Sequence, residues 1–280
     1  MCRMSVLAAT ALALSLAGTS PATAFSFRAK PETAKVEPPP PPPAAASPKA
    51  TPEARALAAG LDPLARAAFW AREANLDPTD LDAGLGLARA LRALGQATEA
   101  AATVQRLAVL APDNVEVLLE LTRAHLARGE GFFGVAPAQQ AQSLAPGDWR
   151  APFLLAMAFE QAQRDDQALA AHRQALQLAP DNPSVLSNMA MFQATRGQAE
   201  EAERLLRKAA ALPGAGAVIR QNLALILGLQ GRMAEAEALA RQDLPPQLVA
   251  NNLAYLRSAS QAGSASGGSG RSWSSVGSAQ

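Results

Sequence analysis

Apolar and polar positions follow a helical period along most of this chain, and the stretch Trp149–Asn182 shows the pattern most simply. Small or apolar residues recur at helical spacing in two runs, which are Leu155, Ala156 and Phe159, then Ala168, Ala175 and Leu178. The pattern predicts two amphipathic helices, the second of which stops at Pro180. Because neither helix can bury its apolar face alone, the pair needs copies of itself on either side.

These copies follow at a period of 34 residues. Prolines that close an apolar helix keep the interval, at Pro78, Pro112, Pro146 and Pro180. Glycines suited to a tight turn with positive φ keep the same frame, at Gly95, Gly129, Gly197 and Gly231. Small residues, which let paired helices approach closely, do so at Ala100, Ala168, Ala202 and Ala236, with Gly134 in the missing slot.

A period of 34 residues with this arrangement of small, apolar and proline positions resembles the tetratricopeptide repeat (TPR) over roughly residues 50–257. The resemblance implies an all-α fold, a right-handed superhelical TPR solenoid. We expect an irregular helix pair over 51–80, in which Thr51 and Asp62 precede the two helix starts. Five units then cover residues 81–114, 115–148, 149–182, 183–216 and 217–250. A last helix, Gln247–Arg257, should cover the exposed end of the solenoid.

The two ends of the chain differ from this pattern. Residues 1–24 have a basic start, an apolar run and a small-x-small motif ending at Ala24, which predicts a secretory signal peptide. An uncleaved N-terminal anchor is the alternative. Residues 25–50 form a Pro/Ala-rich linker whose core, Pro38–Pro43, favours extended polyproline II. Residues 258–280 are rich in Ser and Gly, so we expect a disordered tail.

Composition removes several classes of function. The formal net charge is only +1 and there is no run of Lys or Arg, which argues against nucleic acid as a partner. Cys2 is the only cysteine, so disulfides and cysteine metal sites are excluded. The two histidines, His125 and His172, fall at packing positions of the repeat, where we expect core or boundary roles. Since no phosphate-binding loop or nucleophile–base pair is evident, we expect no catalysis, no cofactor, no metal and no small-molecule substrate.

The TPR resemblance implies a concave groove lined by the first helix of each unit, with binding residues at repeat positions 2, 5, 6, 9, 12 and 13. The candidate groove residues are Arg89, Arg123, Met157, Asn188, Met191, Asn222 and Asn252. In the family an asparagine at position 6 holds the backbone of a bound peptide through its donor and its acceptor. The groove should be basic at its N-terminal end, and apolar with amide groups further along. The alternative is that the asparagines only solvate a surface or cap helices.

One unit departs from the pattern, at the segment Gly129–Pro137. Three glycines and a proline predict that its second helix is shortened to about Pro137–Leu144. We expect Phe132 and Phe133 to tuck into the space that this leaves. If they are exposed instead, they form a hydrophobic loop for a partner.

The whole arrangement resembles the TadD-type pilus assembly proteins of the tight-adherence (Flp) system, most specifically in the closing segment Leu244–Arg257. The resemblance implies a non-enzymatic scaffold whose partners are proteins or extended peptide segments of the pilus secretion machinery. Many such proteins are lipoproteins, but Thr19 stands where the lipid-bearing cysteine would be. We therefore expect a periplasmic or secreted protein, or one associated with the outer membrane, with membrane contact only if the signal segment is uncleaved. The alternatives are a general periplasmic adaptor or chaperone-like protein for envelope or cell-wall complexes, and an accessory subunit of a wall-modifying enzyme.

Overall fold

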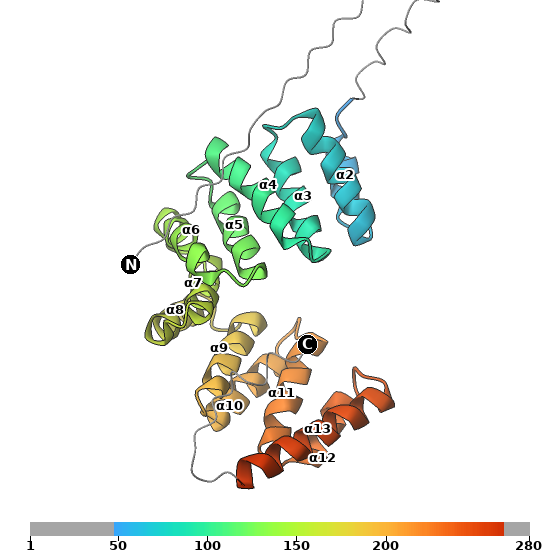
Figure 1. Cartoon of the computed structure of the whole chain (residues 1–280), viewed down its shortest axis with the longest axis vertical. Helices are drawn as coiled ribbons and strands as arrows, with labels where there is room; N and C mark the ends of the chain where they lie inside the picture. Colours follow the sequence, from blue (N-terminus) through green and yellow to red (C-terminus); the bar gives the residue numbers. More distant parts are fainter. Residues whose placement is uncertain (1–47, 266–280) are drawn as a thin grey trace, which may run out of the picture. The chain divides into compact units, whose positions relative to one another are not determined.

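The computed structural model describes residues 48–265, with side chains up to Ser258, and this part of the chain holds thirteen helices and no strand (Figure 1). The predicted signal peptide, the linker up to Ser47 and residues 266–280 of the predicted tail lie outside the described residues. The helices are α1 (Pro52–Ala58), α2 (Pro63–Leu76), α3 (Leu81–Ala93), α4 (Ala97–Leu110), α5 (Val115–Ala127), α6 (Gly131–Leu144), α7 (Arg150–Gln161), α8 (Asp165–Leu178), α9 (Pro183–Thr195), α10 (Ala199–Ala211), α11 (Ala217–Leu229), α12 (Met233–Ala240) and α13 (Pro246–Ala265). Two helices fall in each 34-residue unit, so the fold is the predicted all-helical solenoid.

From α2 onward each helix packs against the next along the chain, and first helices of neighbouring units also meet, as α3 and α5, α5 and α7, and α9 and α11 do. The alanines of the small-residue ladder are fully buried. Ala100, Ala168, Ala202 and Ala236 are all at most 1% exposed, so no larger side chain would fit without displacing a neighbour. Leu178, which the pattern placed on the buried face of α8, is instead 38% exposed near the end of that helix.

Most of the first helices begin with an Asp or Asn whose side chain caps the N-terminus of the helix. The side chain of Asp80 accepts a hydrogen bond from the backbone N–H of Ala83, and Asn114 and Asn182 do the same for the helices that follow them. Each of these residues comes two positions after a proline that ends the preceding helix. Capping the free N–H groups typically stabilises a helix by about 0.5–2 kcal/mol. This proline-x-Asp/Asn spacing therefore ends one repeat and begins the next.

The turns inside the units need a left-handed backbone. Four of them place glycine there, with φ between 73° and 82°, at Gly95, Gly129, Gly197 and Gly231. The third unit has Gln163 at the same position with φ 57°, the only described residue other than glycine with positive φ. A side chain in this region is strained, since its Cβ crowds the carbonyl oxygen that follows.

Two predicted boundaries are wrong. Helix α6 begins at Gly131 rather than Pro137, and Pro137 lies buried inside it. A proline normally breaks a helix by removing one hydrogen bond, but here Val135, Ala138 and Ala141 stay buried against neighbouring helices and hold the helix together. Helix α13 is the second case, because it runs on to Ala265 through a segment that we expected to be disordered. That segment contains no proline to stop it.

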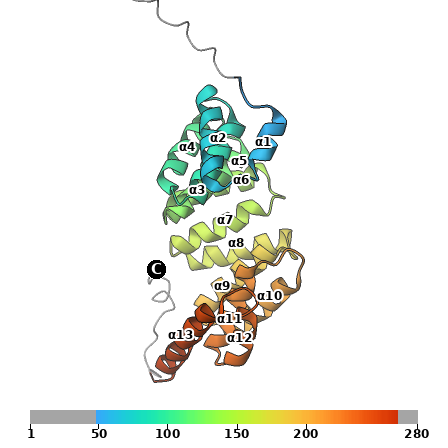
Figure 2. The same cartoon turned by 90° about the vertical axis from the view of Figure 1, so that its right-hand side faces the viewer.

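Helix α13 lies against α11 and α12 (Figure 2). Its buried face consists of Val249, Leu253 and Leu256. Gly228 on α11 makes the approach possible, since a Cβ there would lie 2.4 Å from a methyl carbon of Leu256. The helix therefore covers the end of α11, as the predicted closing helix should.

Candidate functional site

The predicted binding residues lie on the first helices of the units and on α13. They are Arg89 on α3, Arg123 on α5, Met157 on α7, Asn188 and Met191 on α9, Asn222 on α11 and Asn252 on α13. We call the surface formed by these residues the first-helix surface. The structure gathers some of these residues into two groups, one at each end of the surface, and leaves the middle ones apart.

At the N-terminal end, Glu120 on α5 lies among three arginines and is only 1% exposed. Its carboxylate is 2.9 Å from Nε of Arg92, 3.3 Å from Arg123 and 3.6 Å from Arg89. This brings two of the candidate groove residues, Arg89 and Arg123, to one carboxylate. The buried carboxylate needs these partners, because an unpaired charge away from water is costly.

A second acidic residue extends this cluster along the chain. Glu116 pairs with Arg89 at 3.3 Å and with Arg150 at 2.7 Å. Arg150 also pairs with Asp148 at 2.6 Å, and its guanidinium lowers the pKa of that carboxyl. Burial lowers the pKa of Arg123, while the nearby Glu120 carboxylate opposes that shift.

The predicted basic end of the groove is therefore nearly balanced in charge. Four arginines (Arg89, Arg92, Arg123 and Arg150) face three carboxylates (Glu116, Glu120 and Asp148), which leaves one positive charge. The expected positive charge at this end is thus reduced to a small excess, because carboxylates at other repeat positions pair with the arginines. A partner that binds here meets arginines and carboxylates that are already paired with one another, rather than a surface whose charges all have the same sign.

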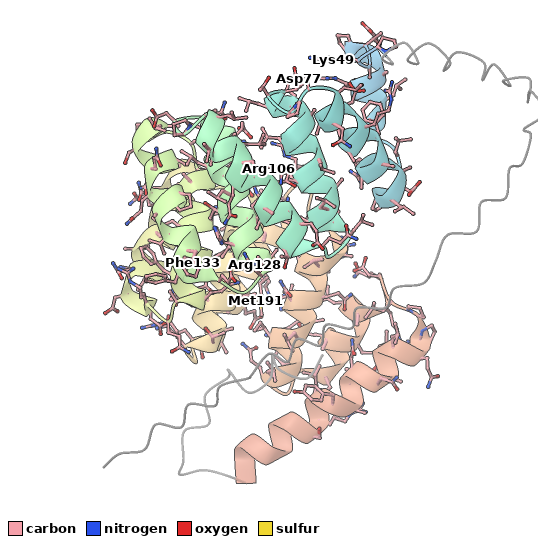
Figure 3. All side chains as sticks on the ribbon, turned by 45° about the horizontal axis from the view of Figure 1, so that its top comes forward. Lys49, Asp77, Arg106, Arg128, Phe133 and Met191 are labelled. Atoms are coloured by element: carbon pink, nitrogen blue, oxygen red, sulfur yellow. The ribbon has the colours of Figure 1, made fainter. Side chains whose placement is uncertain are left out.

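In the middle of the surface, Met157 and Met191 are half-buried and pack against the hydrophobic core (Figure 3 labels Met191). Asn188 is half-buried as well. These residues present small apolar and amide areas.

At the C-terminal end, Asn222 and Asn252 line the same cavity of about 290 Å³. Its walls come from α11, α12 and α13, and include Leu225, Ala240 and Tyr255. The amide nitrogen of Asn222 donates a hydrogen bond to Oγ of Ser187 at 3.2 Å, which fixes its orientation. The cavity is thus mostly apolar, with two amide groups at positions where a peptide backbone can bond to them.

The two phenylalanines of the glycine-rich turn do not tuck into the protein. Phe132 is 69% exposed and Phe133 is 59% exposed, so the expectation that they fill a space was wrong. Gly131 is the residue that faces α7, where a Cβ would meet Gln161, and the next two side chains consequently point away. The two rings form an edge-to-face pair 5.5 Å apart, and Phe133 (Figure 3) also lies 5.9 Å from the ring of His125.

Both histidines are packing residues, as predicted. His125 is 8% exposed, and its Nδ1 lies 3.4 Å from Glu130. His172 is fully buried, with Nε2 2.5 Å from a carboxylate oxygen of Glu160. Neither histidine adjoins a serine or cysteine within hydrogen-bonding distance among the described residues, and no group of three or more metal-ligating side chains occurs in that part of the chain.

Sequence reasoning missed several residues of the first-helix surface. Arg150, Ser187 and Arg92 occupy repeat positions 2, 5 and 12, which belong to the same set of groove positions. The 34-residue period is therefore sufficient to predict all three residues, when each groove position is compared across all five units. The closure of the C-terminal cavity by Tyr255 had no such signal, since α13 lies outside the 34-residue frame. Between residues 48 and 265 no helix combines the length and the apolar character needed to span a membrane.

Comparison with known proteins supports the repeat assignment. A tetratricopeptide repeat family model matches residues 166–213, which cover α8 to α10. A crystal structure of a thermophilic TPR protein from Thermus thermophilus superposes with a TM-score of 0.56 at 24% identity, over 62% of this chain and 96% of that one. MamA from Desulfovibrio magneticus RS-1 is similar over 56% of this chain and 88% of its own, at 18% identity and a TM-score of 0.48, a level that adds nothing to the first similarity. No curated protein matches by sequence. Residues 166–213 therefore match the tetratricopeptide repeat, and the described helices share the fold of a TPR protein.

Proposed function

We propose that this protein is a non-enzymatic scaffold that binds an extended segment of a partner protein along its first-helix surface. The observation that carries the proposal is the C-terminal cavity, where Asn222 and Asn252 face the same apolar space. An asparagine amide both donates to a carbonyl and accepts from an N–H, which matches the repeating groups of an extended peptide. The apolar walls suit one medium-sized side chain of that peptide.

We further propose that the scaffold works in the envelope of a bacterium and assists assembly of a tight-adherence pilus secretion machine. This finer assignment is supported by the sequence resemblance of the signal segment, the Pro/Ala linker and the closing segment Leu244–Arg257 to the TadD-type proteins. The partners would then be components such as a pilin, a secretin or a secretion ATPase. Partners from cell-wall or other envelope machinery would support the general adaptor in its place.

A partner-capture experiment tests both levels. The tagged protein and the double variant Asn222→Ala/Asn252→Ala are used to recover partners from envelope extract, and the affinity of each recovered partner is then measured. Each lost hydrogen bond is worth about 0.5–1.5 kcal/mol, so the double variant should bind roughly ten-fold more weakly. Asn251→Ala is the matched control, because Asn251 is exposed on the same helix and does not line the cavity.

The outcomes separate the alternatives. Equal affinity for a folded double variant would remove the cavity from the binding site, and Phe132 and Phe133 would be the next surface to substitute. Thermal unfolding of each variant shows whether the fold is kept. Recovery of pilus components supports the specific assignment, and recovery of wall-associated proteins alone contradicts it.

A further inference from the structure

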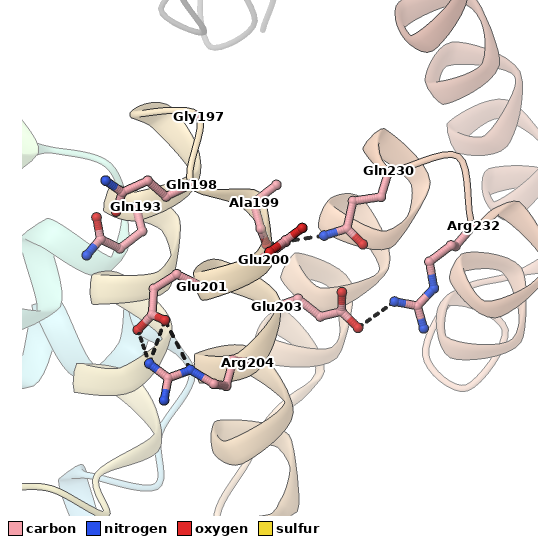
Figure 4. Close-up of a pocket in the computed structure, with 10 residues that line it drawn as sticks. All are labelled: Gln193, Gly197, Gln198, Ala199, Glu200, Glu201, Glu203, Arg204, Gln230 and Arg232. Atoms are coloured by element: carbon pink, nitrogen blue, oxygen red, sulfur yellow. Dashed lines mark hydrogen bonds and ion pairs between the residues drawn. The ribbon is translucent and has the colours of Figure 1, made fainter.

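A second, polar cleft lies at the edge of the solenoid, where the turns of the fourth and fifth units meet (Figure 4). It has a volume of about 1190 Å³ and is open to solvent. One wall is the turn at Gly197 and Gln198 with the first turns of α10, and the other is the turn that carries Gln230 and Arg232. None of the residues of the first-helix surface lines it.

Gln193 on α9 is the unusual residue of this cleft. It is 8% exposed, and within the part of the chain that the structure describes its side-chain amide has no hydrogen-bond partner. The amide carries two N–H donors and a carbonyl acceptor, and it lines the open cleft with these groups unbonded to protein. A ligand in the cleft would supply the missing partners.

The other units do not carry this amide. The residues at the same repeat position are Leu91, His125, Phe159 and Leu227. Phe159 and Leu227 are buried apolar side chains, and Nδ1 of His125 lies 3.4 Å from Glu130. Leucine or phenylalanine can therefore pack at this position, and packing alone does not explain the glutamine of the fourth unit.

The charges of the cleft favour a basic ligand. Glu201 pairs with Arg204, and Glu203 with Arg232, but Glu200 is exposed and has no ion-pair partner among the described residues. Three carboxylates against two guanidinium groups leave one negative charge in the lining. An anion such as a phosphate or a carboxylate would be repelled here, because Glu200 and Glu201 already occupy the first turn of α10.

We propose that this cleft is a second binding site, for an extended peptide segment with a Lys or Arg side chain. The ammonium or guanidinium group pairs with the free carboxylate of Glu200, and the peptide backbone bonds to the amide of Gln193. The site is independent of the proposed use of the first-helix surface, so one chain holds two partner segments at once. That property suits a scaffold, since two weak sites on one molecule raise the effective concentration of the second segment.

The test uses a defined probe. An acetylated and amidated heptapeptide of Gly, Ala and two Lys residues is titrated into the ¹⁵N-labelled protein at millimolar concentration, beside the same peptide with Glu in place of Lys. The lysine peptide should shift the backbone resonances of Gln198, Ala199 and Glu200, and the glutamate peptide should not. Added salt should weaken the binding, because the pair with Glu200 is exposed.

Two variants and a control locate the interaction. Glu200→Gln should lower the affinity for the lysine peptide roughly three-fold or more, and Gln193→Leu should lower it by a similar factor. The Gln193→Leu protein should still fold, because Leu227 occupies the equivalent position in the next unit. Asp166→Asn is the matched control, because Asp166 occupies in the third unit the repeat position that Glu200 occupies in the fourth. This substitution also removes one negative charge. It should leave the affinity unchanged.

Three results would overturn the proposal. These are absence of shifts at Gln198–Glu200, equal binding of the lysine and glutamate peptides, or equal affinity of the Glu200→Gln and Asp166→Asn proteins. The exposed Glu200 keeps the test decisive if Gln193→Leu fails to fold. The partner-capture experiment on Asn222 and Asn252 is unaffected by any of these results.

Discussion

A β-carbon on Gly131 would lie 2.4 Å from the Cβ of Gln161 and 2.6 Å from the carbonyl oxygen of Ala158. Helix α6 therefore touches α7 at its first residue with no room for a side chain. Three residues later, a β-carbon on Gly134 would meet Thr122 and Ala158 at 3.5 and 3.6 Å, which are ordinary contacts. The two glycines of one helix thus have different reasons to be there.

These two positions should respond in opposite directions to the same substitution. In the Gly131→Ala protein the new methyl group would push α6 away from Gln161 and from the backbone of Ala158 on α7. The free energy of unfolding should therefore fall by about 1–3 kcal/mol. Gly134→Ala should raise it by about 0.5–1 kcal/mol, since alanine restricts the unfolded chain and fits the space. Urea unfolding of both variants measures the changes, and a shift in the same direction for both would contradict the packing described for α6.

Gln163 offers a stabilising substitution. Its φ of 57° is strained for a side chain, and the four equivalent turns use glycine. Gln163→Gly should raise the free energy of unfolding by about 0.5–1 kcal/mol, as relief of strain outweighs the added freedom of the unfolded chain. Gly197→Gln, the reverse change one unit later, should lower it by a similar amount, and thermal unfolding of the pair decides the question.

Glu120 should be more important for stability than its neighbour Glu116. Glu120→Gln keeps the shape but leaves three partly buried guanidinium groups facing a neutral amide, which should cost about 1–3 kcal/mol. Glu116 is 41% exposed, and its ion pairs are screened by water, so Glu116→Gln should change stability by less than about 0.5 kcal/mol. The ranking would be contradicted if chemical denaturation gave equal losses.

Acid should weaken the fifth unit through Asp243. The hydrogen-bonded guanidinium of Arg220 lowers the pKa of Asp243 below its ordinary value of 3.8. A carboxyl whose pKa is lower in the folded state adds stability above the ordinary value, and this contribution is lost as pH falls through the folded pKa. Asp243→Asn should therefore lower the Tm at neutral pH, and the difference from the natural chain should shrink at about pH 3 and below. A Tm difference that stays constant with pH would show that the pair does not contribute through charge.

Much of the fold follows from the spacing of a few residue types. Prolines, glycines and small residues at one interval place the helix pairs of the five units, because a solenoid repeats the same local constraints. The frame failed at Pro137 and at Phe132 and Phe133, where the contact of Gly131 with α7 decides the outcome and no local pattern reveals it.

The candidate site could be predicted only in part. The helix and position of each groove residue follow from the repeat, so the joining of Arg89 and Arg123 was predictable. Their neutralisation by Glu120 depends on side chains from two different helices meeting, which a count of one repeat position misses. The unpaired amide of Gln193 could have been found by comparing position 11 across the units, since the other units carry Leu, His, Phe and Leu there.

The packing of Leu256 over Gly228 sets the length of the array. Helix α13 occupies the side of α11 on which a sixth unit would have to stack, and the α12–α13 connection at Pro245 and Pro246 is out of step with the 34-residue period. Duplication of a unit during evolution could therefore lengthen the array only upstream of α11, with the terminal cavity of Asn222 and Asn252 carried along unchanged at the end. The repeat number can vary among descendants of such a chain while this terminal binding element stays constant.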